Sequence, residues 1–320
     1  MINQKKNDFA PILLIAFNRS NHFYNTLIAL CNNRFADKSD LYISIDGPLN
    51  ENDKKSQKLI YEYLKIAKNY FAKVILIKNK VNKGLAENIT QSISYVLKEH
   101  KKIIVVEDDL ITSKSFLNFM NDALDFYEDK KKVWHINGHN IISNKDKKDE
   151  IFLWRFMNCW GWATWRDRWL NFEMNPDFFI ESFNDEMIYK FNLDGIANFW
   201  EQVILNSEGK KKTWAIFWYA TIFLNDGICV SPWFSFVQNI GFDGSGVNCE
   251  KGLSKKKSEE INHLGKFIGL SNLVEDKKAF KIMQKEYSKP FLKVLITKIL
   301  KRTLGKSRYI ILKNFLIRFI

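Results

Sequence analysis

The residues with the clearest capacity for chemistry are three consecutive carboxylates, Glu107, Asp108 and Asp109, at the end of the stretch 102–106, which is apolar from Ile103 to Val106. An apolar run of this length predicts a strand buried on both faces, as in a parallel sheet. Three acids at the end of such a strand repel one another. A hard divalent cation such as Mg²⁺ or Mn²⁺ would relieve that repulsion while bridging to substrate phosphates. Because ligands of open α/β sheets bind beyond the carboxyl ends of the strands, this stretch predicts a metal–phosphate site. A solvated acidic turn before the next helix is the alternative.

The elements that must position these acids are alternating strands and helices in the first half of the chain. We expect strands at 11–17, 41–45, 73–77, 102–106 and 133–136, and helices at 20–31, 53–70, 85–97 and 115–127. This alternation predicts parallel βαβ units with right-handed crossovers, in which Asn18-Arg19, Asp46-Gly47 and the three acids meet at one edge of the sheet. An arginine and several acids on one rim suggest a nucleotide site. No GxGxxG or Walker A pattern accompanies these strands, which counts against NAD enzymes and P-loop kinases.

Aromatic residues dominate the chain after residue 150. The segment 160–169 holds four tryptophans together with a glycine and two arginines. Tryptophan rings can stack on the apolar faces of sugars, but they can equally fill the core between this half and the sheet. We expect one or two rings to face a cleft and the others to pack inside. Helices are predicted at 184–207 and 212–226, and a short strand at 228–230.

A glycine-rich segment at 236–246 surrounds the single acid Asp243. Three glycines close together favour a mobile loop, and such a loop could close over a substrate and exclude water. An ordinary surface turn is the alternative reading of the same composition.

The composition is that of a folded protein. Of 320 residues, 46% are hydrophobic and 15% aromatic, which excludes a disordered or collagen-like chain. The four cysteines have no short pairing spacing, so we expect neither a zinc site nor a disulfide framework, and a reducing compartment. The first residues lack the pattern of a signal peptide, and no apolar run reaches the roughly 18 residues of a membrane span. We therefore expect a cytoplasmic protein.

The positive charge gathers at the end of the chain. The formal net charge is +13, and no acid follows Glu286, whereas nine lysines and arginines do. Apolar residues interleave them at helical spacing, which predicts a basic amphipathic tail on the inner face of the plasma membrane. A solvated terminal helix is the alternative. Nucleic acid is not expected as a partner, because no nucleic-acid-binding motif accompanies the charge.

Five motifs together resemble a known family. They are Ala16-Phe17-Asn18-Arg19, Ser44-Ile45-Asp46-Gly47, Val105-Val106-Glu107-Asp108-Asp109-Leu110, Trp160-Gly161-Trp162-Ala163-Thr164-Trp165 and Asn239-Ile240-Gly241-Phe242-Asp243-Gly244. In this order they resemble nucleotide-sugar glycosyltransferases of the GT-A fold, closest to a bacterial family 2-like (hemolysin-activation-like) group and similar in layout to N-acetylglucosaminyltransferase I. The resemblance covers roughly residues 9 to 249.

This resemblance implies an α/β fold of GT-A type, with a Rossmann-like, mostly parallel sheet flanked by helices. Residues 1–140 would form the nucleotide-sugar-binding half and 141–250 the acceptor-side half of one catalytic domain. Residues 251–320 would be a charged linker and the basic tail.

The resemblance also implies roles for individual residues. The donor nucleotide sugar would be bound by Phe17, Arg19, Asp46, Lys83, Gly84, Glu107 and Asp108, with Asp46 on the uracil, Glu107 on the ribose and Asn82 in the turn beside them. Asp109 would be the protein ligand of Mn²⁺ or Mg²⁺. Gly161 and Trp162 would line the donor sugar and the acceptor.

The catalytic base is the point at which the chain departs from the family pattern. In N-acetylglucosaminyltransferase I it is supplied by a Trp-Asp-Asp-Trp segment, whereas the corresponding stretch here, Trp214 to Trp218, contains no carboxylate. Glu201 and Asp243 are the candidates, and we favour Asp243 because its loop could close over the acceptor.

The expected function is metal-dependent transfer of a hexosyl or N-acetylhexosaminyl group. The donor would be a nucleotide sugar, in particular a UDP-sugar. The acceptor would be a hydroxyl of a growing bacterial surface glycan, such as capsule or lipopolysaccharide, free or lipid-linked. A single displacement assisted by one base would invert the anomeric centre. A sugar-phosphate nucleotidyltransferase and a non-catalytic glycan-binding protein are the alternatives.

Overall fold

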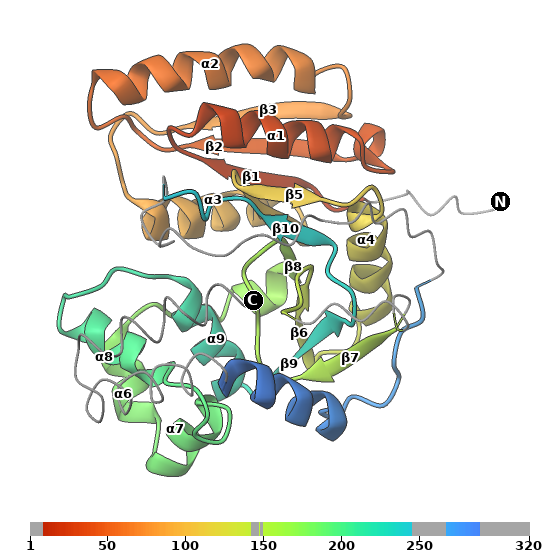
Figure 1. Cartoon of the computed structure of the whole chain (residues 1–320), viewed down its shortest axis with the longest axis vertical. Coiled ribbons are helices and arrows are strands. Elements are labelled where there is room, and N and C mark those ends of the chain that lie inside the picture. Colours follow the sequence, from red (N-terminus) through yellow and green to blue (C-terminus); the bar gives the residue numbers. More distant parts are fainter. Residues whose placement is uncertain (1–8, 142–146, 148–149, 245–266, 289–320) are drawn as a thin grey trace, which may run out of the picture.

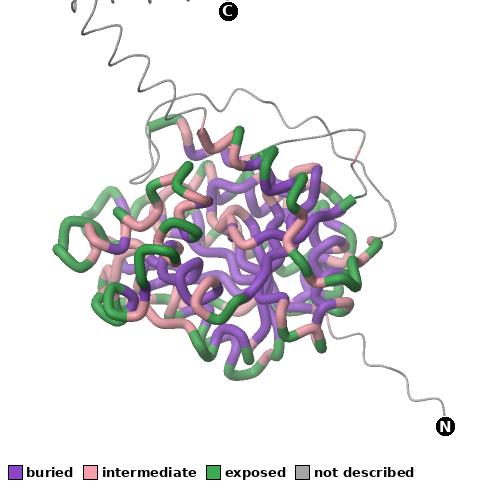
Figure 2. The backbone as a smooth tube through the Cα atoms, turned by 90° about the horizontal axis from the view of Figure 1, so that it is seen from below, coloured by how far each residue is buried: buried purple, intermediate pink, exposed green. Residues whose placement is uncertain are grey.

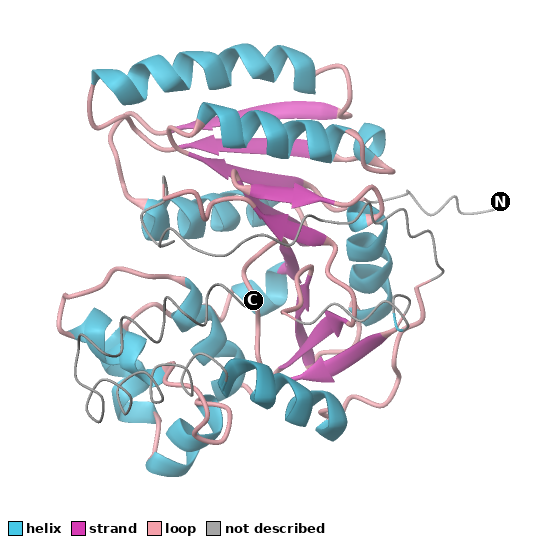
Figure 3. Ribbon diagram, in the orientation of Figure 1, coloured by secondary structure: helices cyan, strands magenta, loops and turns pink. Residues whose placement is uncertain are grey.

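The computed structural model describes residues 9–141, 147, 150–244 and 267–288 of the chain. Within these residues, eight strands form one sheet in the order β3-β2-β1-β4-β8-β6-β9-β7, with helices on both faces (Figures 1 and 3). The strands of this sheet are β1 (Ile12–Ala16), β2 (Asp40–Ile45), β3 (Lys73–Lys78), β4 (Lys102–Glu107), β6 (Val133–Asn137), β7 (Ile151–Trp154), β8 (Trp162–Trp165) and β9 (Ile228–Pro232). A second, two-stranded sheet pairs β5 (Leu110–Thr112) with β10 (Val237–Asn239).

The helices follow the strands along the chain. They are α1 (Ser20–Cys31), α2 (Glu51–Ala67), α3 (Leu85–Glu99), α4 (Phe116–Tyr127), α5 (Arg166–Trp169), α6 (Pro176–Ser182), α7 (Asp185–Phe191), α8 (Trp200–Ser207) and α9 (Ala215–Leu224), with a one-turn 3-10 helix at Ala36–Lys38. The predicted α/β class, with a large Rossmann-like sheet flanked by helices, is confirmed. The division of the chain at residues 140 and 250 stays a prediction.

The first four strands are parallel neighbours, as the strand–helix alternation predicts. Strands β1, β2 and β4 are buried along almost their whole length, and their successive side chains point to opposite sides of the sheet, whereas β3 at the sheet edge is half-buried or exposed. Leu14 joins the core beneath α1, α2 and α4, whereas Leu13 joins the core beneath α3. The near-continuous apolar composition of these strands therefore follows from helices that cover both faces.

The second half of the chain continues the same sheet. Strand β8 lies antiparallel between β4 and β6, so the tryptophan-rich segment is partly a central strand, which the sequence analysis did not assign. The single helix predicted at 184–207 is wrong. It breaks into α7 and α8 because Leu193, Asp194 and Gly195 all have positive φ, at 53°, 55° and 78°.

Residues 267–288 pack onto this body. A helix over 277–288 buries Ala279, Phe280 and Met283 in the core of the second half. The burial pattern in Figure 2 shows the buried backbone running through the centre of the molecule. Among the described residues, no helix has both the length and the hydropathy needed to cross a bilayer. The predicted basic tail after residue 288 lies outside the described residues.

Candidate active site

The three carboxylates Glu107, Asp108 and Asp109 lie at the carboxyl end of β4, at the edge where β1 and β2 also end. Parallel pairing places Ile15 opposite Glu107, and Ala16 opposite Ile45. The predicted convergence of the three strand ends is therefore confirmed. Helix α1 begins at this edge, and its Thr26 hydroxyl donates a hydrogen bond of 2.7 Å to the Asp108 carbonyl oxygen. The acidic cluster is thus built into the sheet and α1 and is no freely solvated turn.

Arg19 is the counter-ion of this cluster. Its Nη2 contacts Asp108 Oδ1 and lies 3.0 Å from Asp109 Oδ2. The three side chains are largely buried, with 19% of Arg19, 5% of Asp108 and 10% of Asp109 exposed. One guanidinium therefore bridges two carboxylates at the strand end.

The charge of the cluster is only partly balanced by Arg19. Burial, with repulsion from Asp109 and Asp108, raises the pKa of Glu107 to about 8, although Arg19 opposes the shift. Burial also raises the pKa of Asp108 to about 6, again against the pull of Arg19. Desolvation disfavours each carboxylate, and like charges add to that cost. A further positive charge at this position would therefore be stabilised.

Asp46 organises the neighbouring turn. Its Oδ1 accepts hydrogen bonds from the Gly47 and Lys83 amides at 2.9 and 3.0 Å, and its Oδ2 accepts one from the Gly84 amide at 2.9 Å. Asn82 Nδ2 donates to the Gly47 carbonyl at 2.8 Å, which closes the turn against the end of β2. Both oxygens of Asp46 thus already accept hydrogen bonds from backbone amides of this turn. A contact between Asp46 and the nucleobase stays a prediction.

The other predicted donor residues lie on the same edge. Gly84 precedes α3 with φ of 78°, a conformation that favours glycine. Lys83 Nζ donates to Gln91 Oε1 at 2.5 Å and so lies along α3. Gln57 Nε2 donates to the carbonyls of Phe17 and Asp46 at 3.1 and 2.9 Å, which ties the ends of β1 and β2 together.

The segment 240–243 crosses the acidic cluster. The Ile240 amide donates to the Asp109 carbonyl at 2.8 Å. A Cβ on Gly241 would fall on Asp109 Oδ2 and would lie 3.2 Å from Arg19 Nη1. Glycine is required here by close approach, and the segment lies directly against the carboxylate predicted to bind metal.

Asp243 follows in the same segment and reaches α1. Its Oδ2 lies 3.2 Å from His22 Nε2, and half of its side chain is exposed. The predicted base Asp243 is thereby brought to the edge that carries the acidic cluster. Glu201 is not: it lies in the first turn of α8, is exposed, and accepts a 2.9 Å hydrogen bond from Asn198. Helix α8 packs with α6 and α9, away from β5 and β10 (Figure 1).

Trp162 contradicts the prediction that its ring lines a sugar site. Its exposed fraction is 0%, and it stacks on His135 and Trp214 at centroid distances of 4.9 and 5.6 Å. The ring fills the core because β8 is central in the sheet. Trp160 is the partly buried ring of the motif, and it contacts His139 and Phe242 at 4.6 and 5.7 Å.

Gly161 is also enclosed. It has φ of 60°, its carbonyl accepts from the Gly138 amide at 2.7 Å, and a Cβ would meet Val237 and Phe116. The positive φ and the lack of space for a Cβ explain why residue 161 is a glycine. A role toward a sugar stays a prediction.

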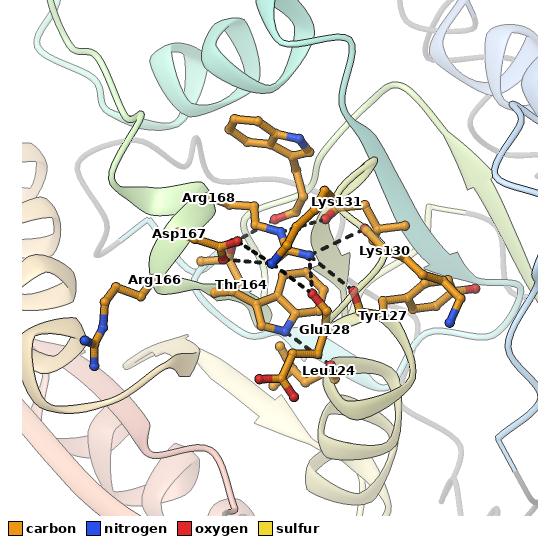
Figure 4. Close-up of polar contacts among 12 residues, drawn as sticks. Leu124, Tyr127, Glu128, Lys130, Lys131, Thr164, Arg166, Asp167 and Arg168 are labelled. Carbon is orange, nitrogen blue, oxygen red and sulfur yellow. Dashed lines mark hydrogen bonds and ion pairs between the residues drawn. The ribbon is translucent and has the colours of Figure 1, made fainter.

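The arginine at the end of the tryptophan motif is structural. Arg168 is 3% exposed and stacks on Trp165 with 4.3 Å from its guanidinium carbon to the ring centroid. Its Nη2 donates to the carbonyls of Tyr127, Glu128 and Lys130 at 3.2, 2.8 and 3.4 Å, at the end of α4 (Figure 4). These are carbonyls that a helix C-terminus leaves without intrahelical partners.

A divalent ion fits the acidic cluster on the chemistry of its donors. Asp108 and Asp109 offer only oxygen, which suits Mg²⁺ or Mn²⁺, and Arg19 already holds a positive charge there. Among the described residues, no group of three or more His, Cys, Asp or Glu could hold a metal. Mg²⁺ needs no such group when one or two carboxylates share it with substrate phosphates and water. The cluster therefore fits an ion that is completed by a phosphate ligand.

Two residues of this edge, His22 and Gln57, were missed by the sequence analysis, and Gly241 was named there only as part of its motif, without its contact to Asp109. His22 follows Arg19 by three positions on α1, so it lies near Arg19 at one turn of the helix. This spacing of three residues could have been used to predict that His22 lies near Arg19. The contacts of Gln57 and Gly241 depend on tertiary packing, for which the sequence holds no local signal.

Comparison with known proteins gives weak likenesses. No protein-family model matches this chain, and no curated protein matches it. Among solved structures it is similar to GalNAc-T7 with UDP, GalNAc and Mn²⁺, at TM-score 0.44 and 10% identity, over 71% of this chain and 43% of that one.

Two further solved structures are similar to this chain at comparable scores. S. aureus TarS matches at TM-score 0.39 and 10% identity, over 71% of this chain and 59% of that one. The mannosyltransferase PcManGT from Pyrobaculum calidifontis, in complex with GDP-Man and Mn²⁺, matches at TM-score 0.39 and 9% identity, over 68% and 71%. The chain thus spans less than two thirds of TarS and of GalNAc-T7. At these scores the likenesses carry no argument about function.

Proposed function

We propose that this chain is a metal-dependent glycosyltransferase that transfers a hexosyl or N-acetylhexosaminyl group from a nucleotide sugar, in particular a UDP-sugar. The observation that carries the proposal is the gathering of Asp108, Asp109 and Arg19 at one sheet edge, beside the turn held by Asp46. Carboxylates that suit a hard ion, next to an arginine that suits phosphate, match the two halves of a metal–diphosphate group. This edge is also the position where open α/β sheets bind nucleotides.

The metal would supply electrostatic stabilisation of the departing nucleoside diphosphate. Asp109 and Asp108 would hold it, and Arg19 would take a share of the diphosphate charge. Asp46 would act by fixing the 82–84 turn, which frames the nucleotide. Glu107 would form a hydrogen bond with a ribose hydroxyl, which can donate to a carboxylate or accept from a protonated carboxyl.

Asp243 is our candidate for the base that takes the proton from the acceptor hydroxyl. Its neighbour His22 and its place in the segment that crosses the cluster support this role over Glu201. Attack from the face opposite the leaving group would invert the anomeric centre. The acceptor, a hydroxyl of a growing bacterial surface glycan, and attachment to the membrane surface are proposed from the sequence alone.

The test is release of UDP from a panel of UDP-sugars by the full chain, with Mn²⁺ and with EDTA. We expect release that requires Mn²⁺ and that falls to background in Asp109→Asn. Glu128→Gln removes a carboxylate outside this edge and is the control for loss of one negative charge. Release that is equal in EDTA, or equal in Asp109→Asn and wild type, would contradict the proposal.

A further inference from the structure

The guanidinium of Arg19 occupies the place at the acidic cluster where a cation would bind. Its guanidinium contacts Asp108 and lies 3.0 Å from Asp109 Oδ2, an oxygen of the carboxylate proposed to bind metal. The same oxygen lies so close to Gly241 that a methyl group there would collide with it. Asp109 is 7% exposed. The carboxylate is therefore enclosed by an arginine and a backbone segment.

A metal ion and this arginine would compete for the same carboxylate. A Mg²⁺ ion binds carboxylate oxygen at about 2.0–2.1 Å and arranges its other ligands in an octahedron. A guanidinium at hydrogen-bond distance from the same oxygen would lie next to that coordination sphere with a like charge. Since Gly241 limits the space on the segment side of Asp109 Oδ2, an ion can bind this oxygen well only after Arg19 has left it.

Arg19 also has an alternative partner that fits it better. A guanidinium pairs with phosphate through two parallel hydrogen bonds, and such pairs are among the strongest in proteins. A diphosphate held by an ion on Asp109 would bring its oxygens to this strand end. The guanidinium would then exchange carboxylate oxygens for phosphate oxygens and would remain paired with negative charge.

We propose that Arg19 is an internal counter-ion that occupies the acidic cluster until a divalent cation and a nucleotide diphosphate bind together. The ion replaces the guanidinium on Asp109, and the released guanidinium pairs with the diphosphate. This inference rests on the proposed function, and it adds a physical reason for the two ligands to bind cooperatively. Linkage requires that each ligand strengthens the other by the same factor.

The experiment measures Mn²⁺ binding to the full chain by the loss of the free-ion electron paramagnetic resonance signal, without and with saturating UDP, relative to the same solutions without protein, because UDP itself binds Mn²⁺. For the wild type we expect weak binding of Mn²⁺ alone and binding about tenfold or more tighter with UDP. For Arg19→Gln we expect Mn²⁺ alone to bind about tenfold more tightly than in wild type, because its competitor is gone. UDP should strengthen that binding by a smaller factor than in wild type, because only the direct ligation of the ion by the diphosphate remains.

Two variants control for charge and for the site. Arg34→Gln removes a positive charge from an exposed position beyond the other end of α1, so it should behave as wild type. Asp109→Asn should lose Mn²⁺ binding with and without UDP. If Arg19→Gln does not fold, the wild-type coupling decides alone, because equal Mn²⁺ affinity with and without UDP overturns the proposal.

The outcomes separate this inference from the proposed function. Unchanged or weaker binding of Mn²⁺ alone in Arg19→Gln overturns the counter-ion role, even where Mn²⁺-dependent UDP release is observed. Tighter binding in Arg19→Gln supports the counter-ion role, even where no UDP-sugar is cleaved and the transferase proposal fails. Absence of Mn²⁺ binding in every variant overturns both.

Discussion

Replacing Arg168 by methionine should destabilise the protein through the junction of α4, β6 and β8. Methionine keeps much of the apolar stem but removes the guanidinium, which donates to four backbone carbonyls at 2.8–3.4 Å. Two of them, those of Tyr127 and Lys130, also accept from backbone amides at 3.0 and 2.9 Å, so they keep a partner in the variant. The Glu128 carbonyl keeps only a long contact, 3.4 Å from the exposed Lys131 Nζ, so the loss concentrates on the carbonyls of Glu128 and Val133.

The size of the effect follows from these contacts. Each buried acceptor left without its partner costs about 1–3 kcal/mol. Loss of the stack on Trp165 adds about 0.5–1 kcal/mol. The ion pair with Asp167 adds little, because that carboxylate is half exposed. Together these terms amount to a loss of about 2.5–7 kcal/mol, a large share of the roughly 5–15 kcal/mol by which proteins are stable.

The assay is urea unfolding followed by tryptophan fluorescence, with Arg166→Met as the matched control. Arg166 lies two positions earlier, is only partly buried, and donates one side-chain bond, from Nε to the His100 carbonyl at 3.0 Å. Its variant should lose about 0.5–1.5 kcal/mol. A loss in Arg168→Met that is no larger than in Arg166→Met would refute the structural role of Arg168.

Three further predictions concern the site and the core. Asp243→Asn should lower kcat by about 10²–10⁴-fold with UDP affinity retained, whereas Glu201→Gln should keep wild-type kcat; equal losses would remove Asp243 as the base. Gly241→Ala should destabilise the fold by about 1–3 kcal/mol and weaken UDP binding, because its methyl group displaces Asp109 or the segment 240–243; calorimetric binding at the wild-type level would contradict this. Burial lowers the pKa of His135 from 6.5 to about 3, so its contribution to stability is present above pH 6.5 and is lost as the pH falls toward 3. His135→Gln should therefore show a shallower loss of unfolding free energy between pH 6.5 and 4.5, and an unchanged slope would argue against a neutral buried ring.

Much of the sheet edge could be predicted because its signals are local. Apolar runs that end in Asn18-Arg19, Asp46-Gly47 and the acids of 107–109 mark strand ends, and parallel topology brings them together. The tryptophan motif could not be resolved in the same way. Its rings are compatible with a sugar site or a core, and burial of Trp162 depends on β8 inserting between β4 and β6.

The partner of the acids was also beyond sequence reasoning. The three carboxylates predicted a cation, but the described structure satisfies two of them with Arg19. A bound cation and an arginine both reduce the repulsion between the carboxylates, so the composition of this stretch cannot tell which of the two is present. The break between α7 and α8 was missed because three consecutive residues with positive φ include two, Leu193 and Asp194, that are not glycine.

The most direct measurement of the central claim is calorimetric binding of UDP to the full chain in Mn²⁺, in EDTA and in the Asp109→Asn variant. We predict binding in Mn²⁺ that weakens by about a hundredfold or more in EDTA and in the variant, a loss of about 2.7 kcal/mol. UDP binding that is undiminished in both conditions would show that the carboxylates at the end of β4 hold no metal–diphosphate group.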